Sequence, residues 1–290
     1  MAKLLTGREA ASALIAALHR RTAALAERGV TPKLAILRCG ENESDGAYLR
    51  SAQQRAALCG VVVEVTSLPE TVSREALLSV IDDINCDASV HGCLLLRPLP
   101  AHLRDAENAI CNRLLPEKDV DGMTDVSAAG VYLGRTTGFA PCTAEAVTVL
   151  LDHYGIDCAG KRAAVIGRSP VVGRPAAMLL LARNATVTVC HTRTRALSAI
   201  TREADIIVSA AGAAGCLTAA HVRPGQTIID VSANWDAAKN SIVGDADFDA
   251  AVSIVEAITP VPGGVGAVTS TVLMRHVVQA AERTLEGGNL

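Results

Sequence analysis

The sequence is poor in aromatic residues: Phe, Trp and Tyr make up only 2% of its 290 residues. Ala, Val, Leu and Ile must therefore fill the core, which is typical of buried parallel strands covered by Ala-rich helices. Hydrophobic residues make up 50% of the chain, yet no uninterrupted apolar run approaches the roughly 18 residues that cross a bilayer. We therefore expect the apolar residues to fill soluble cores and expect no membrane partner.

The chain also lacks an excess of basic residues and any regular spacing of cysteines. It has 27 Lys+Arg against 30 Asp+Glu, a formal net charge of -3, which argues against a nucleic-acid partner. The nine cysteines are odd in number, scattered and never spaced Cys-x-x-Cys. This pattern argues against a disulfide framework and a zinc site, so we expect no metal and a reducing, cytoplasmic location.

The length favours two domains, since a domain has roughly 150 residues. In the first part, periodicity predicts helices at 7–28, 47–59 and 73–85, and strands at 33–39, 61–67 and 90–96. Such alternation predicts a parallel sheet. The Pro- and Gly-rich segment 97–141 breaks this rhythm, and we expect it to be irregular and to lie over a site.

After this segment the alternation resumes. A helix is predicted at 143–154 and strands at 163–167, 186–190, 205–209 and 227–231, followed by an apolar run at 253–259 and a helix at 270–285. The predicted fold class is therefore α/β, with two α/β domains and a second domain that is Rossmann-like. We place the first domain at 1–141, with residues 270–290 packing back onto it, and the second at 142–269.

The strongest local motif is the segment 165–175, which follows a predicted strand and opens a helix. Gly167 and Gly173 lie six residues apart, so this is not the usual Gly-x-Gly-x-x-Gly pattern, and a tight turn without a ligand is the alternative. A helix N-terminus there offers N–H groups to a phosphate, and Arg168 and Ser169 add a cation and a hydroxyl. After the next strand, Thr192 and Arg193 suit a 2′-phosphate, which predicts NADP as the cofactor.

Residues 259–266 contain three glycines within four positions, Gly263, Gly264 and Gly266. A plain connecting loop is one interpretation. The alternative is a loop whose bare backbone approaches a flat ligand closely, because glycine has no side chain to obstruct it.

Five segments occur in the order found in one enzyme family: Arg97-Pro98-Leu99-Pro100, residues 116–122, Pro141-Cys142-Thr143, residues 167–175 and residues 259–266. Through them, and over essentially its whole length, the chain resembles the FolD-type 5,10-methylenetetrahydrofolate dehydrogenase/cyclohydrolases. The resemblance implies two α/β domains flanking a cleft, folate bound by the first, NADP bound by the second, and a homodimer formed through the NADP domain.

The resemblance also implies site residues. Tyr48 matches the tyrosine that stacks on the folate aminobenzoyl ring, and Asp121 matches the acid that binds the pterin nitrogens. A structural tyrosine and a helix-capping carboxylate, a role that Asp119 would equally allow, are the alternatives. The further substrate-binding positions are Leu96, Arg97, Pro98, Pro262, Gly263 and Gly264. The cofactor-binding positions are Gly167, Arg168, Ser169, Val172, Gly173, His191, Thr192, Arg193, Ala233 and Thr269.

Under this resemblance two family residues are missing. The catalytic lysine, four residues after the tyrosine, is Ala52, and a register shift to Gln54 does not restore it. Where the family reads Gln-Leu-Pro-Leu-Pro, this chain reads Leu96-Arg97-Pro98-Leu99-Pro100, so the glutamine that tunes the lysine is also absent. Loss of both partners favours a changed chemistry. Arg50 and Arg97 are the nearest cations, and we expect both to face solvent.

The leading hypothesis is therefore NADP-dependent oxidation of 5,10-methylenetetrahydrofolate to 5,10-methenyltetrahydrofolate, with weak or absent cyclohydrolase activity. One alternative is a fully bifunctional enzyme that activates water with an unrecognised group. The other is a folate- and NADP-binding paralogue without catalysis.

Overall fold

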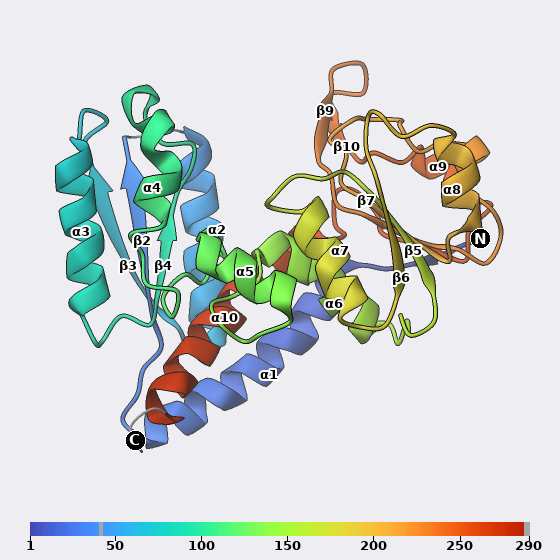
Figure 1. Ribbon diagram of the computed structural model, residues 1–290. Helices are drawn as coiled ribbons and strands as arrows, with labels where there is room; N and C mark the ends of the chain where they lie inside the picture. Colours follow the sequence, from blue (N-terminus) through green and yellow to red (C-terminus); the bar gives the residue numbers. More distant parts are fainter. Residues whose placement is uncertain (41–42, 287–290) are drawn as a thin grey trace. The chain divides into compact units, whose positions relative to one another are not determined.

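The computed structural model describes residues 1–40 and 43–286, and within them every side chain except those of residues 43–45, 47, 48 and 286 (Figure 1). The chain forms two compact units. The six-stranded unit contains residues 1–12 and 143–269, and the three-stranded unit contains residues 13–142 and the chain from Ser270 onward. Residues 1–12, which we expected in the first domain, thus group with the second block, because β1 (Lys3–Leu4) pairs with β11 (Ala257–Ile258).

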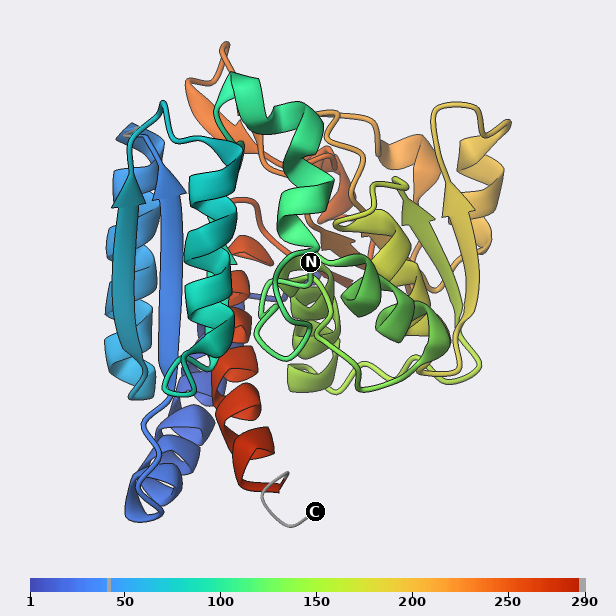
Figure 2. The same cartoon turned by 60° about the vertical axis from the view of Figure 1, so that its left-hand side comes forward.

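The three-stranded unit is built on a parallel sheet in the order β3-β2-β4. Its strands are β2 (Lys33–Cys39), β3 (Val62–Leu68) and β4 (Gly92–Leu95), connected through α2 (Glu43–Cys59) and α3 (Arg74–Cys86). Figures 1 and 2 show α3 on one face of this sheet and α2 on the other. Successive side chains of a strand point to opposite faces, so Leu37 packs in the core on the α3 side, whereas the fully buried Ile36 faces the other side.

The segment 97–141, expected to be irregular, contains short helices. They are η1 (Ala101–Ala106), α4 (Glu107–Cys111) and α5 (Asp125–Leu133). The signals for α5 are local: the Thr124 hydroxyl accepts a hydrogen bond from the Ser127 N–H at its start, and Gly134 adopts φ +64° at its end. The periodicity of the sequence does not reveal these helices, because each is shorter than the window in which periodicity is read.

The six-stranded unit has a parallel sheet in the order β1-β11-β8-β7-β5-β6. Its further strands are β5 (Arg162–Ile166), β6 (Thr186–Cys190), β7 (Ile206–Ser209) and β8 (Thr227–Asp230). All four residues of β7 and of β8 are buried, as expected for strands covered on both faces. The connecting helices are α7 (Gly173–Leu181), α8 (Leu197–Glu203) and α9 (Phe248–Ala251), with a 3₁₀ turn, η2 (Ala219–His221).

Three further helices are α1 (Gly7–Glu27), α6 (Cys142–His153) and α10 (Gly266–Glu286). Within the three-stranded unit α1 and α10 are joined by an ion pair in which Arg21 Nε lies 2.8 Å from Glu282 Oε1. An antiparallel hairpin, β9 (Asn234–Asp236) and β10 (Ser241–Val243), is not predicted from the sequence. None of the helices in the described ranges is long and apolar enough to span a membrane.

The predicted α/β class, with a parallel sheet in each block, is confirmed by the structure. The predicted strands at 33–39 and 186–190 match β2 and β6 residue for residue. The apolar run at 253–259 contributes only the two residues of β11, since most of the run before that strand forms turns.

Candidate active site

The turn after β5 explains why two glycines lie six residues apart. Gly167 has φ +117°, and a Cβ atom on it would overlap the Ala210 carbonyl oxygen just beyond β7. A Cβ on Gly173 would overlap the Gly167 carbonyl oxygen. Neither position tolerates a side chain, because both approaches are closer than any van der Waals contact. The first turn of α7 therefore packs directly on the strand end.

This turn lies at the switch point of the sheet. The chain leaves β5 toward β6 on one side of the sheet, whereas it leaves the neighbouring strand β7 toward β8 on the other side. Open α/β sheets bind ligands at the carboxyl ends of two such strands. The Ser169 hydroxyl accepts hydrogen bonds from the N–H groups of Val172 at 3.1 Å and Gly173 at 3.4 Å. Ser169 thus closes the turn, while its neighbour Arg168 is exposed.

A second turn lies beside the first. Ile166 of β5 and Cys190 of β6 are register partners, and the Gly167 N–H donates to the Cys190 carbonyl oxygen at 2.8 Å. His191 Nδ1 accepts from the Arg193 N–H at 3.1 Å, which shapes this second turn. The turn leaves Thr192 and Arg193 exposed.

Four arginines surround these two turns and carry no ion pair within the described part of the chain: Arg168, Arg174, Arg193 and Arg195. All four are exposed. Cations at the carboxyl end of the first two strands of such a sheet lie where a dinucleotide's phosphates bind. The residues present therefore fit a phosphorylated dinucleotide.

Backbone contacts hold the Pro/Gly loop of residues 259–266, which follows β11. The Gly263 carbonyl oxygen accepts from the Gly7 N–H at 2.8 Å, and a Cβ on Gly264 would lie 2.5 Å from the Pro260 carbonyl oxygen. Gly264 is therefore needed for packing, and Gly263 for its φ of +105°. Pro262 and Gly263 are exposed and available to a ligand.

Thr269, predicted to contact the cofactor, lies in the first turn of α10. Its hydroxyl donates to the Gly266 carbonyl oxygen at 2.9 Å, one turn earlier in the same helix. The hydroxyl oxygen keeps its lone pairs for a donor from a ligand.

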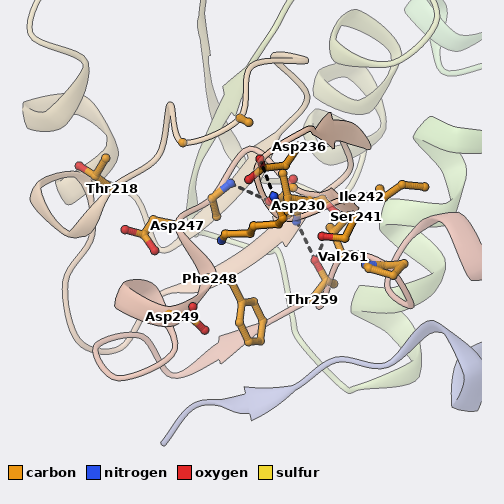
Figure 3. A pocket seen from close by; sticks show the side chains of 17 residues that line it. Thr218, Asp230, Asp236, Ser241, Ile242, Asp247, Phe248, Asp249, Thr259 and Val261 are labelled. Atoms are coloured by element: carbon orange, nitrogen blue, oxygen red, sulfur yellow. Dashed lines mark hydrogen bonds between the residues drawn. The ribbon is translucent and has the colours of Figure 1, made fainter.

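A cavity of about 630 Å³ lies beside β8, β11 and the hairpin (Figure 3). Asp230 at the end of β8 lines it, with the Asp230 N–H donating to the Thr259 hydroxyl at 2.7 Å. Burial raises the pKa of the Asp230 carboxyl to about 6. Of the predicted site residues, Pro262 lines this cavity. In the described ranges, neither the turn after β5 (residues 167–173) nor the turn after β6 (residues 191–193) lines it.

Asp245 organises the strand ends of this unit, and no sequence pattern indicates that role. Its fully buried carboxylate accepts hydrogen bonds from the hydroxyls of Ser209 and Ser232 and from the Asn234 amide. It also accepts from the backbone N–H groups of residues 211 and 213, at 2.7 and 2.8 Å. No motif marks Asp245, because most of its partners come from distant segments.

The predicted cofactor residue Ala233 lies between two of the groups that hydrogen-bond to Asp245, Ser232 and Asn234. Ala233 itself is exposed. The network around Asp245 thus holds the backbone on both sides of this position.

In the three-stranded unit, the two aspartates of the segment 116–122 have different environments. Asp119 is fully buried and accepts from the N–H groups of Met123 and Thr124 and from the Ser127 hydroxyl. It is the residue that shapes the turn before α5. The support of this helix start thus belongs to Asp119, and Asp121 has a different role.

Asp121 instead faces Arg97. Arg97 Nη2 lies 3.7 Å from Asp121 Oδ2, and Arg97 Nη1 lies 3.8 Å from Glu107 Oε1. Burial raises the pKa of the Asp121 carboxyl, whereas the Arg97 guanidinium and a hydrogen bond with the Cys142 side chain lower it.

Arg50 is exposed, as expected. Arg97 is also exposed as a whole residue, but its side chain is only 29% exposed and its guanidinium lies within reach of the carboxylates of Asp121 and Glu107. These partners come from later segments, and no local pattern pairs them with Arg97.

Ala52 and Leu96, which the resemblance places where the family has its lysine and glutamine, are at least partly buried. Ala52 is 1% exposed on α2, and the half-buried Leu96 follows β4, its N–H donating to the Leu37 carbonyl oxygen at 2.9 Å. Pro98 follows Arg97 and is exposed. Tyr48 belongs to α2, but its side chain lies outside the described residues.

Comparison with known proteins identifies the two units. The catalytic domain of tetrahydrofolate dehydrogenase/cyclohydrolase matches residues 5–121, and the NAD(P)-binding domain of the same family matches residues 141–285. The bifunctional protein FolD of Alkaliphilus oremlandii is 43% identical over 280 residues, which cover 97% of each chain.

Two solved structures are also similar. The bifunctional FolD of Campylobacter jejuni is 37% identical, with a TM-score of 0.93 over 98% of this chain and 100% of that chain. The Trypanosoma brucei methylenetetrahydrofolate dehydrogenase-cyclohydrolase, solved with NADP and an inhibitor, is 34% identical, with a TM-score of 0.89 over 98% of each chain. Both domains are matched in order and the likeness runs along nearly the whole length, so the chain belongs to the tetrahydrofolate dehydrogenase/cyclohydrolase family.

Proposed function

We propose that this chain oxidises 5,10-methylenetetrahydrofolate with NADP as the hydride acceptor, and that its cyclohydrolase activity is weak or absent. The observation that carries the proposal is the pair Ala52 and Leu96, which we assign to the positions of the family's lysine and glutamine. Neither side chain can accept or donate a proton, and Ala52 is almost fully buried.

The two family reactions make different demands on the protein. In the oxidation, the methylene C–H bond breaks and both its electrons leave with the hydrogen as hydride. The lone pairs of the two adjacent folate nitrogens stabilise the carbon cation that forms, and no protein group exchanges a proton. NADP⁺, when bound, supplies the hydride acceptor at nicotinamide C4. The protein's contribution is positioning, which does not require a lysine.

Hydrolysis of the methenyl bridge is more demanding. Water adds to the cationic carbon, and a proton of that water must leave before the ring opens to the 10-formyl product. A positioned base and acid usually contribute about 10²–10⁴-fold to such a step. Arg97 is a poor substitute, since an arginine stays protonated and its guanidinium faces Asp121 and Glu107.

For the folate, we assign Asp121 to the pterin N–H groups and Tyr48 to the aminobenzoyl ring. Leu96, Arg97 and Pro98 follow β4 near Asp121, as the 3.7 Å distance from Arg97 to Asp121 indicates. The resemblance also assigns Pro262, Gly263 and Gly264 to substrate binding; Pro262 and Gly263 are exposed, and Gly264 is buried in the packing of their loop.

For the cofactor, the two turns after β5 and β6 support NADP over NAD. The glycine turn of residues 167–173 would hold the pyrophosphate, and the exposed Thr192 and Arg193 would contact the 2′-phosphate. Arg168 adds a second cation without an ion pair in the described part of the chain. The NADP bound in the T. brucei relative supports the same choice.

Both activities should be measured on one preparation of the protein. With methylenetetrahydrofolate and NADP⁺, we expect NADPH and methenyltetrahydrofolate to accumulate together, because hydrolysis does not remove the second product. With methenyltetrahydrofolate alone, we expect decay no faster than in buffer. A bifunctional FolD is the positive control, and rapid hydrolysis by the unmodified chain would overturn the proposal.

The double variant Ala52→Lys with Leu96→Gln should gain hydrolysis. Ala52→Lys alone should gain less, because the ammonium would lack its hydrogen-bonding partner. Ala52→Met with Leu96→Gln is the matched control: it adds a similar length of chain at residue 52 without a titratable group. Equal hydrolysis by the Lys and Met variants would show that the position does not carry the chemistry.

A fully bifunctional enzyme is the second candidate, and the bifunctional relatives that match along the whole chain favour it. It requires a water-activating group other than residues 52 and 96. A folate- and NADP-binding protein without catalysis would bind both ligands in calorimetry and produce no NADPH. The paired assays therefore distinguish all three functions.

The proposal includes a homodimer formed through the six-stranded unit. Its support is the hairpin, on which Trp235 is 66% and Ile242 44% exposed, since exposed large apolar side chains often mark a protein interface. Trp235 is the single tryptophan of the chain, so its fluorescence should shift to shorter wavelength on association. Light scattering that shows a monomer at micromolar concentration would contradict the dimer.

A further inference from the structure

Arg97 lies in the proposed folate site, but the proposed function gives its charge no role. The resemblance places a leucine at this position, between the missing glutamine and the first proline of the segment. Here the guanidinium lies between two carboxylates, with one terminal nitrogen near Asp121 and the other near Glu107. Asp121 is the residue to which the proposal assigns the pterin ring.

We propose that Arg97 is a positioning residue that balances the charge of the Asp121 carboxylate and orients it toward the folate ring. This inference rests on the proposed function, because it takes the Asp121 carboxylate as the pterin acceptor. Arg97 acts through Asp121 and takes no part in the hydride transfer.

Arg97 can stabilise the Asp121 carboxylate without occupying the lone pairs that a ligand would use. The 3.7 Å separation from Arg97 Nη2 to Asp121 Oδ2 is longer than a hydrogen bond, so the attraction is mainly that of two charges. A long contact leaves lone pairs of the carboxylate available for the pterin N–H donors. The Arg97 and Asp121 side chains are 29% and 25% exposed, which leaves the pair accessible while screening it less than a fully exposed one.

The charged and titratable groups around Asp121 come from several elements. Asp119 lies on the same loop, Cys142 begins α6, and His276 belongs to α10, in addition to Arg97 after β4. Burial raises the pKa of Asp121, and Asp119 raises it further; Arg97, then the Cys142 hydrogen bond and His276, lower it. Arg97 is therefore the largest influence that favours the ionised form.

Removing Arg97 should change the pKa of Asp121 in a definite direction. Without Arg97 the pKa of Asp121 rises further, so the carboxylate takes up a proton at a higher pH. A protonated carboxyl cannot accept hydrogen bonds from two pterin N–H groups on equal terms. Folate binding should therefore weaken on the acid side, while the hydride transfer within the bound complex changes little.

The test compares Arg97→Leu, Arg97→Lys and the unmodified protein between about pH 5.5 and about pH 8.5. In Arg97→Leu we expect the acid limb of kcat/KM for methylenetetrahydrofolate to move to higher pH, with KM raised severalfold on the acid side, where the carboxylate takes up its proton earlier than in the unmodified protein. Most of this loss should disappear at the alkaline end, and kcat should change by less than about threefold. Arg97→Lys keeps the charge and should lie between the other two proteins.

Glu107→Gln is the complementary variant. It removes the carboxylate that shares the guanidinium with Asp121, so the acid limb should stay in place or move to lower pH. The Kd for NADP and the Tm serve as controls and should be unchanged in all three variants. Calorimetric binding of tetrahydrofolate over the same pH range gives a second measurement that needs no turnover.

Two results would overturn the inference. One is an acid limb and a tetrahydrofolate Kd that are the same in Arg97→Leu and the unmodified protein. The other is a loss in Arg97→Leu that is equal at every pH and is not rescued by Arg97→Lys, which indicates a purely structural role. Failure of the proposed function is a different outcome: the unmodified protein produces no NADPH, whereas the pH dependence of tetrahydrofolate binding still decides the role of Arg97.

Discussion

Asp245 in the six-stranded unit and Asp121 in the three-stranded unit are both aspartates near predicted site residues, yet their surroundings differ. Asp245 is fully buried and accepts hydrogen bonds from two hydroxyls, one side-chain amide and two backbone N–H groups. The Asp121 side chain is 25% exposed and faces the Arg97 guanidinium across 3.7 Å.

This difference distinguishes a carboxylate that holds the fold together from one that can bind a ligand. A carboxylate offers about four lone-pair sites, and the donors around Asp245 fill them, so it has nothing to offer a ligand. Asp119 is occupied in the same way by Met123, Thr124 and Ser127, although it lies only two residues from Asp121. Nearness to Asp121 in the sequence therefore does not identify a carboxylate that can bind a ligand. The number of lone pairs that have no donor within the protein is a better indicator.

The largest effect is expected for Asp121→Ala. Two hydrogen bonds to a charged group contribute about 1.5–3 kcal/mol each, so kcat/KM for methylenetetrahydrofolate should fall about 10²–10⁴-fold. Because Asp121 supports no turn or helix start, the Tm and the Kd for NADP should stay nearly unchanged. The exposed Asp105→Ala is the matched control. Normal turnover by Asp121→Ala would place the pterin elsewhere.

Asp245→Ala should show the opposite pattern. Several buried donors lose their acceptor at once, and the free energy of unfolding should fall by about 3–5 kcal/mol. Chemical denaturation measures this loss, with the exposed Asp249→Ala as control. If Asp245→Ala keeps its stability but loses NADP binding, Asp245 belongs to the site and the contrast with Asp121 fails.

Asp230 is an intermediate case, because burial raises its pKa to about 6 while two N–H groups hydrogen-bond its carboxylate. An acid with a raised pKa binds its proton more tightly in the folded state, so its contribution to stability is present at low pH. That contribution is lost as the pH rises from about 4 to about 6, and it amounts to about 3 kcal/mol.

Denaturation curves of the unmodified protein and of Asp230→Asn test whether this stability is lost as the pH rises. The difference in unfolding free energy between the two proteins should change across that pH window in favour of the variant, because the amide carries no charge. Parallel pH dependences would mean that Asp230 does not titrate in this range.

The smallest effect is expected for Arg168→Ala. Arg168 is exposed, so its charge is screened and shared with Arg193, and we expect the Kd for NADP to rise about 5–30-fold, or 1–2 kcal/mol. The Kd for NAD should rise less. Arg183→Ala is the matched control, because that arginine is paired with Asp152. Equal losses for NADP and NAD would assign Arg168 to the pyrophosphate in place of the 2′-phosphate.

Much of the fold follows from local sequence. The runs of β2 and β6 have the lengths and apolar or β-branched content of parallel strands, and periodicity locates them to the residue. The glycine turn of residues 167–173 is also recognisable, since only glycine fits a positive φ or so close an approach. These features depend mostly on neighbours within a few positions, and the order of residues contains them.

The state of each carboxylate was decided by the tertiary structure. The sequence allowed Asp119 or Asp121 to support the helix start, and the fold assigned that role to Asp119 and brought Arg97 to Asp121 from 24 residues earlier in the chain. Asp245 meets Ser209 from 36 positions away. Hydrogen-bond partners so distant leave no periodic signal, because they are brought together by strand order in a sheet and by loop paths. Local sequence determined the long strands and helices, and their packing determined which carboxylate keeps lone pairs for a ligand.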